Sequence, residues 1–113
     1  MKITNEMIVQ AANEAAVAHE NYRQAAKIAD DALVTKMNKL KFLESTSTAA
    51  SVLSYAHAEA VLRIAVISKD DARIAEKLAV DELVKLQLKQ HAQNGDKRAQ
   101  RAVDMMEREK EKR

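Results

Sequence analysis

The feature that most constrains the fold of this chain is the scarcity of residues that end a helix. Its 113 residues include no proline and a single glycine, Gly95. Relative to alanine, glycine weakens a helix interior by about 1 kcal/mol and proline by about 3 kcal/mol. Aromatic residues, which favour strands, make up only 3% of the chain, whereas 32% of its residues are charged. The sequence therefore predicts an all-α fold, an elongated helical bundle of three to four helices.

The first predicted helix is long. Thr4 or Asn5 is the expected N-cap, and no strong helix breaker follows before Ser45. Apolar residues recur at helical spacing through the stretch: Ile8, Ala11, Ala15, Ala18, Tyr22, Ala26, Ala29, Leu33, Met37 and Leu40. An unbroken helix here would be ~60 Å long at 1.5 Å per residue. We expect it to be bent, to be interrupted near Asp30-Asp31, or to belong to an elongated bundle.

The clearest interior break is the run STST, Ser45–Thr48, because these side chains bond to nearby backbone groups and favour caps and turns. A second helix should begin near Thr48. The stretch from Ser68 to Asp71 has the spacing of a capping box, with Asp where Glu or Gln is usual. We therefore favour a break or kink at Ser68. The alternative is one continuous helix from Thr48 to Gln93.

Asn94-Gly95 is the only strong C-terminal stop signal, and Asp96 can cap the helix that follows. The sequence thus predicts one helical domain over residues 1–95 and a charged C-terminal helix or mobile tail over residues 96–113. The tail's apolar stripe is short: Ala99, Ala102, Val103 and Met106. It should dock weakly or become ordered on a partner.

Two segments of the chain resemble each other. RQAAKIADDALV (23–34) and RIAEKLAVDELV (73–84) are identical at seven of twelve positions. Each copy places two alanines and a leucine on one helix face: Ala25, Ala29 and Leu33 in the first, Ala75, Ala79 and Leu83 in the second. We interpret the repeat as a packing stripe rather than a doubled active site. The two stripes should pack similarly, and we expect them to pack against each other.

The histidines do not form a metal motif. The Glu-x-x-His pattern of di-iron bundles is missing, because Ala16, Ser54 and Leu88 precede the three histidines by three residues. The segment that begins at His19 and Glu20 lacks the second histidine of a zinc-protease motif. His57 and Glu59 are two residues apart and so lie on different helix faces. No metal ligand and no cofactor are predicted.

Catalytic residues are not predicted either. The neighbours in Asp30-Asp31 and in Asp70-Asp71 diverge by about 100° on a helix, so neither pair converges on one point. A single glycine cannot build a phosphate-binding loop, and the chain has no cysteine nucleophile. We therefore expect a protein that is not an enzyme.

The compartment is expected to be the cytoplasm. The chain has no cysteine, which fits a reducing environment. Its first fifteen residues lack the apolar core of a signal peptide. No run approaches the ~20 apolar residues of a membrane span, so we expect no membrane association.

The leading functional hypothesis is a protein–protein interaction module: an adaptor, inhibitor or assembly subunit. The segment from Leu78 to Leu88 is apolar nearly all round, which suggests burial on more than one side. The candidate interface residues are Leu78, Val80, Leu83, Val84, Leu86 and Leu88. With few aromatics the core is thin, so a homo-oligomer is expected. In general style the chain resembles small phage or mobile-element proteins that dock on a host enzyme.

The alternative hypothesis is a nucleic-acid-associated accessory protein. Two basic clusters could follow a phosphate backbone: Lys36, Lys39 and Lys41, and Lys97, Arg98 and Arg101. The net charge is only +2, and acidic residues interrupt the tail. Electrostatics therefore favours the protein-interaction hypothesis.

Overall fold

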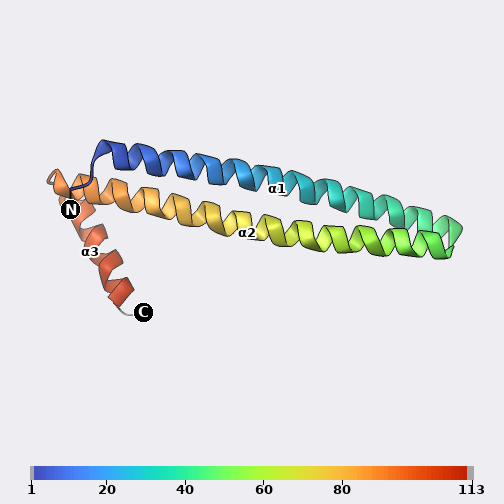
Figure 1. Cartoon of the computed structure of the whole chain (residues 1–113). Helices are drawn as coiled ribbons and strands as arrows, with labels where there is room; N and C mark the ends of the chain where they lie inside the picture. Colours follow the sequence, from blue (N-terminus) through green and yellow to red (C-terminus); the bar gives the residue numbers. More distant parts are fainter. Residues whose placement is uncertain (1, 112–113) are drawn as a thin grey trace. The chain divides into compact units, whose positions relative to one another are not determined.

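The computed structural model describes residues 2–111, and it places them in three α-helices (Figure 1). These are α1 (Asn5–Thr46), α2 (Ala49–Gln93) and α3 (Lys97–Glu111), with 42, 45 and 15 residues. No strand occurs between residues 2 and 111. The predicted all-α helical bundle is confirmed, with three helices rather than four.

The helix α1 begins at the predicted cap. The Met7 N–H donates to Thr4 Oγ1 at 3.3 Å, so Thr4 is the N-cap residue. The helix then continues through Asp30-Asp31 without interruption. Both aspartates are exposed, so their carboxylates stay hydrated and only their modest helix propensity opposes the helix.

The STST run ends α1 as predicted. The Ser47 N–H donates to the carbonyl oxygen of Leu43 at 3.0 Å, and Ser47 then adopts a left-handed backbone conformation with φ of 41°. This single residue reverses the chain, and α2 begins two residues later, at Ala49. Thr48 caps the new helix through its Oγ1, which accepts from the Ser51 N–H.

The break favoured at Ser68 is wrong, because α2 is continuous from Ala49 to Gln93. A capping box can begin a helix, but it does not end the one before it. The residues that precede Ser68, Val66 and Ile67, offer no left-handed C-cap. An exposed serine inside a helix costs less than about 0.7 kcal/mol relative to alanine.

The Asn94-Gly95 stop is confirmed. Gly95 has φ of 98°, its N–H donates to Ala92, and the Asp96 N–H donates to the His91 carbonyl at 3.0 Å. These two bonds form a Schellman motif, in which a left-handed glycine closes the helix end. Asp96 Oδ1 then accepts the N–H groups of Arg98 and Ala99 and caps α3 as predicted.

The chain divides into two compact units. Within the described residues, unit 1 comprises 2–18 and 76–111, and unit 2 comprises His19–Ala75. In each unit, segments of α1 and α2 run side by side in opposite directions (Figure 1). In unit 1, α3 adds Ala99 and Val103 to the buried residues. The division into a helical domain over residues 1–95 and a charged helix or tail over residues 96–113 stays a prediction.

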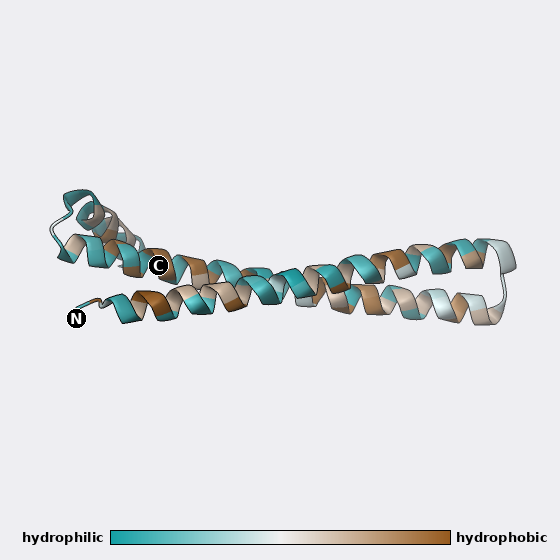
Figure 2. Ribbon diagram, turned by 90° about the horizontal axis from the view of Figure 1, so that it is seen from above, coloured by the Kyte–Doolittle hydropathy of each residue, from teal (hydrophilic) through white to brown (hydrophobic). Residues whose placement is uncertain are grey.

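The core of unit 2 consists almost wholly of alanine. Ala29, Ala32 and Ala65 form its buried cluster, and Leu62 packs against them. Ala29 of the first repeated segment packs with Ala65, which lies outside the second segment. That the two repeated segments pack against each other stays a prediction. Figure 2 shows hydrophobic residues recurring along both helices of this unit, well beyond the few that are buried.

Candidate interaction surface

The exposed surface of unit 2 carries the large apolar side chains that its core lacks. An alanine seam lets the two helices meet through small side chains, so bulkier ones remain outside. The exposed large apolar residues of unit 2 are Ile28, Leu33, Val34, Met37, Leu40 and Phe42 of α1, and Val52, Leu53, Val61, Ile64, Val66, Ile67 and Ile74 of α2. Single exposed apolar residues are normal, but thirteen in one two-helix unit make its surface a candidate interaction surface.

The seam positions of α2 follow a heptad. Residues 51, 55, 58, 62, 65, 69 and 72 are buried or half-buried and face α1. Two of them, Ala58 and Ala65, are about 95% buried, with exposures of 5% and 6%. Spacings of three and four residues are those of a helix–helix seam.

A second heptad runs along α2 two residues out of step with the seam. It consists of Leu53, His57, Ala60, Ile64, Ile67, Asp71 and Ile74, which we call the outer stripe. Two residues correspond to about 200° around a helix, so most of the outer stripe lies on the side of α2 away from the seam. His57 lies at the edge of the stripe, where it lines a groove with Thr35 and Lys39 of α1. Leu53 is 71% exposed, Ile64 67% and Ile67 61%. The stripe therefore has helix-packing spacing without a partner helix among the described residues.

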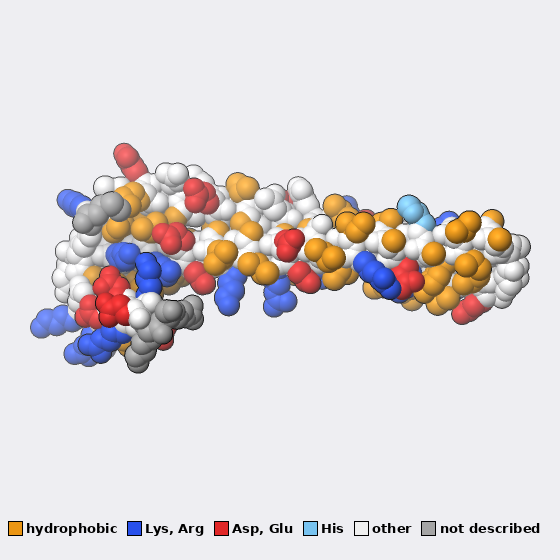
Figure 3. Space-filling view, turned by 60° about the horizontal axis from the view of Figure 1, so that its bottom comes forward, with side chains coloured by type: hydrophobic (Ala, Val, Ile, Leu, Met, Phe, Trp, Pro, Cys, Tyr) orange, Lys and Arg blue, Asp and Glu red, His pale blue; other side chains and the backbone are white. Residues whose placement is uncertain are grey.

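The surface has few charges in the first half of α2, where Glu59 and Arg63 are the charged residues between positions 49 and 68. In Figure 3, hydrophobic side chains cover most of the visible face of unit 2, whereas Lys, Arg, Asp and Glu side chains gather over unit 1. One ion pair lies within the apolar part of α2, where the Arg63 guanidinium donates to Glu59 Oε1 at 2.9 Å. Low charge density of this kind is characteristic of the centre of a protein interface.

The six predicted interface residues all lie in the unit 1 part of α2, where they divide into two groups. Leu78, Val80 and Val84 are exposed, and Leu83, Leu86 and Leu88 are half-buried. Their role as an interface stays a prediction. The sequence reasoning missed the outer stripe of unit 2. In this part of α2 the buried alanines follow one heptad register, and several large apolar residues follow a second register two residues further along the chain. That second register was the available signal.

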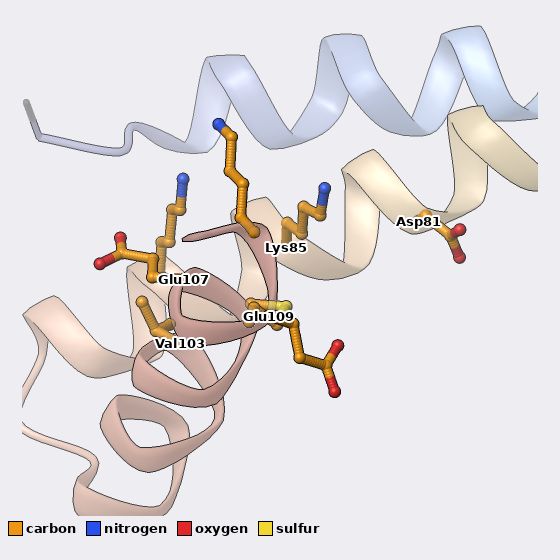
Figure 4. A pocket seen from close by; sticks show the side chains of 8 residues that line it. Asp81, Lys85, Val103, Glu107 and Glu109 are labelled. Atoms are coloured by element: carbon orange, nitrogen blue, oxygen red, sulfur yellow. The ribbon is translucent and has the colours of Figure 1, made fainter. Parts of the chain in front are cut away.

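A groove of about 470 Å³ lies between α2 and α3 in unit 1 (Figure 4). Its lining residues are Asp81, Lys85 and Lys89 of α2 and Val103, Met106, Glu107, Glu109 and Lys110 of α3. The carboxylates of Asp81, Glu107 and Glu109 point in different directions, so they do not converge on a common ligand. Mixed charges on flexible side chains fit a solvated helix–helix groove better than a catalytic site.

His19 and His57 belong to unit 2, and His91 belongs to unit 1. His57 lines a groove of about 330 Å³ in unit 2 together with Thr35, Lys39 and Ser54. The carbonyl oxygen of His91 accepts bonds that end α2 in unit 1. Over residues 2–111, no group of three or more His, Asp or Glu side chains is arranged to hold a metal ion.

The two basic clusters lie in different units. Lys36 is half-buried in the α1–α2 seam, whereas Lys39 lines the groove beside His57 and Lys41 is exposed. Residues two apart do not share a helix face, so this cluster does not present a single basic surface. Lys97, Arg98 and Arg101 are all exposed on α3 of unit 1.

One helix among the described residues, α2, is long and apolar enough to cross a membrane, judged by length and composition alone. Its most apolar window has a mean hydropathy of 1.3, and 17% of that window is buried. The same composition suits a helix whose outer side is covered by protein. A single such helix is weak support for a membrane span, and the absence of membrane association stays a prediction.

No protein-family model, no curated protein and no solved structure matches the chain. The function is therefore inferred from the geometry of the chain itself.

Proposed function

We propose that the protein is a non-enzymatic protein–protein interaction module of the cytoplasm, an adaptor, inhibitor or assembly subunit that works through exposed apolar helix faces. The observation that carries the proposal is that unit 2 buries small side chains and exposes large apolar ones. Four of the five residues buried in unit 2 are alanines, and thirteen larger apolar side chains remain exposed.

The energetics support a partner. Full burial of a Val, Leu or Ile side chain contributes about 1.5–3 kcal/mol relative to exposure. The alanine seam of unit 2 supplies little of this free energy, since an alanine buries only one methyl group. A protein partner on the exposed residues would add the apolar burial that the two-helix unit lacks.

Site-specific photocrosslinking tests the proposal. A photoreactive amino acid is placed at Ile64, in the apolar surface, and at Asp30, an exposed polar position of α1 in the same unit. In cells that express the full chain, the probe at position 64 should give discrete protein adducts, and the probe at position 30 should give far fewer. Equal labelling from both positions, or no protein adduct from position 64, would contradict the proposal.

A nucleic-acid role is the second candidate, and one observation favours it. Lys97 and Arg98 stand in the first turn of α3, where the helix dipole disfavours cations. A functional need would explain this local conflict. A salt titration of binding to duplex and single-stranded DNA separates the candidates, because phosphate contacts weaken steeply with salt. Binding at low salt that Arg98→Ala and Arg101→Ala abolish would support this role.

A further inference from the structure

We propose that the partner on unit 2 is a second copy of this chain, which packs antiparallel on the outer stripe of α2. The helices of the two α1–α2 hairpins then lie side by side, with the two α2 helices in the middle. This inference rests on the proposed function and names its partner. Three observations support it: the accessible surface, the register of α2, and the placement of Asp71 in the stripe.

The accessible surface of the chain is large enough for a stable dimer. The chain exposes 8753 Å² at a mass of 12.6 kDa. A folded monomer of that mass exposes roughly 6,200 Å², by the scaling of surface with mass. The excess of about 2,500 Å² is spread over both units, and roughly a third of it would supply the ~800 Å² that each partner contributes to a standard interface.

The register of α2 indicates that a helix is the occupant. Continued toward the C-terminus, the outer-stripe heptad reaches Asp81, Lys85 and Ala92. These three residues line the grooves that α2 forms with α3 in unit 1. One part of this register therefore already accepts a helix within the chain. The unit 2 part carries larger apolar residues at the same spacing and has no such helix.

The Asp71 carboxylate in the stripe favours a second copy that runs in the opposite direction. His57 and Asp71 are 14 residues apart, which is two heptads, with Ile64 midway between them. A parallel pair would place Asp71 beside the partner's Asp71, and like charges in such a seam are unfavourable. An antiparallel pair centred on Ile64 places each Asp71 opposite position 57 of the partner, about 21 Å along the helix axis from the partner's Asp71, so the two carboxylates do not meet. Polar residues at seam positions commonly fix direction and register in this way.

The first test measures mass by sedimentation equilibrium on the full chain. The wild type should behave as a dimer. Ile64→Asp should weaken association about 100-fold or more, because it buries a carboxylate in the apolar seam. The matched control is Val34→Asp, which introduces the same charge at an exposed valine of α1 outside the stripe and should leave the dimer intact. A monomeric wild type, or equal loss in both variants, would overturn the proposal.

The second test reports the relative direction of the two α2 helices. It uses variants that keep the dimer, so it does not depend on the stability of a variant in which the dimer is lost. The chain has no cysteine, so single-cysteine variants are unambiguous. Ile64→Cys should form a disulfide-linked dimer on oxidation, because the two copies meet at this residue. Leu53→Cys should not link to itself, since the two positions would lie about 33 Å apart in the antiparallel pair. Linking of both variants would overturn the antiparallel arrangement.

A third arm separates the other possible occupants. Vesicles of phosphatidylcholine and phosphatidylglycerol are sedimented with the wild type and with Ile64→Asp. Binding that requires Ile64, combined with a monomeric wild type, would assign the stripe to a lipid surface and overturn both proposals. A photocrosslink from position 64 to a different protein, without self-adducts, would overturn self-pairing and leave the proposed function standing.

Discussion

Thr48 and Ser51 exchange hydrogen bonds across the first turn of α2. The Thr48 N–H donates to Ser51 Oγ at 2.9 Å, and the Ser51 N–H donates to Thr48 Oγ1 at 3.1 Å. The Ser51 hydroxyl also donates to the Thr48 carbonyl at 2.8 Å, and Ser51 has no exposed surface. This is a capping box in which a short serine replaces the usual Glu or Gln. The short side chain fits because the site is buried beside the chain reversal at Ser47.

The reciprocal pair should stabilise the hairpin of unit 2. Thr48→Ala removes one acceptor of the cap, and we expect it to lower the free energy of unfolding by about 1 kcal/mol, within the range of about 0.5–2 kcal/mol for N-cap losses. Urea denaturation followed by circular dichroism measures the change. Ser45→Ala is the control, because its exposed hydroxyl only donates to the carbonyl of Phe42. Equal losses of unfolding free energy in the two variants would show that the Thr48 cap does not stabilise the hairpin more than an exposed hydroxyl does.

Close approach of α1 and α2 in unit 2 depends on alanine at the seam. Ala29→Leu adds three carbon atoms to a position that is 5% exposed, and overpacking of this kind costs about 1–3 kcal/mol. Ala56→Leu makes the same change at an exposed position of α2 in the same unit and should stay within about 0.5 kcal/mol of the wild type. The midpoint of urea denaturation distinguishes them. A neutral Ala29→Leu would mean that the seam has room for larger side chains.

The N-terminus of unit 1 is held by side chains at the end of α2. The Ile3 N–H donates to Gln93 Oε1 at 2.9 Å, and Gln90 Nε2 donates to Asn5 Oδ1 at 2.6 Å. Gln93→Ala should increase the hydrogen-exchange rate of the Ile3 amide and lower stability by about 1 kcal/mol. Gln87→Ala, at an exposed position of the same helix, should change neither quantity. An unchanged Ile3 amide in Gln93→Ala would show that packing alone orders this segment.

Helix ends were predictable from sequence where one residue ends or caps the helix through its own backbone or through the backbone of a near neighbour. Thr4, Gly95 and Asp96 are of this kind, because capping and left-handed glycine depend on three or four consecutive residues. The break predicted at Ser68 was wrong because the same local pattern is compatible with a helix start and with a helix interior. The helix continues through Ser68 because no helix-ending residue precedes it.

The contacts between helices were less predictable. Periodicity placed Ala29 and Leu33 on the same face of the first helix, but only Ala29 is buried, and Leu33 is 45% exposed. Which of two neighbouring positions enters the seam depends on the residue opposite, here Ala65. That residue lies 36 positions away in sequence, so the α1 pattern alone does not contain it. The same limit hid the outer stripe, which can be recognised only once the seam register of α2 is known.

The left-handed glycine that ends α2 offers the sharpest test of the local part of the fold. Gly95 has φ of 98°, and a Cβ built there would meet nothing within 4 Å. Any destabilisation by Gly95→Ala must therefore come from the backbone conformation, and we expect about 1 kcal/mol. Gly95→Asn should cost less, because asparagine adopts the left-handed region more readily. Thermal and urea unfolding of the two variants measure this order. If the alanine variant were as stable as the asparagine variant, the left-handed backbone at position 95 would not control the stability of this helix end.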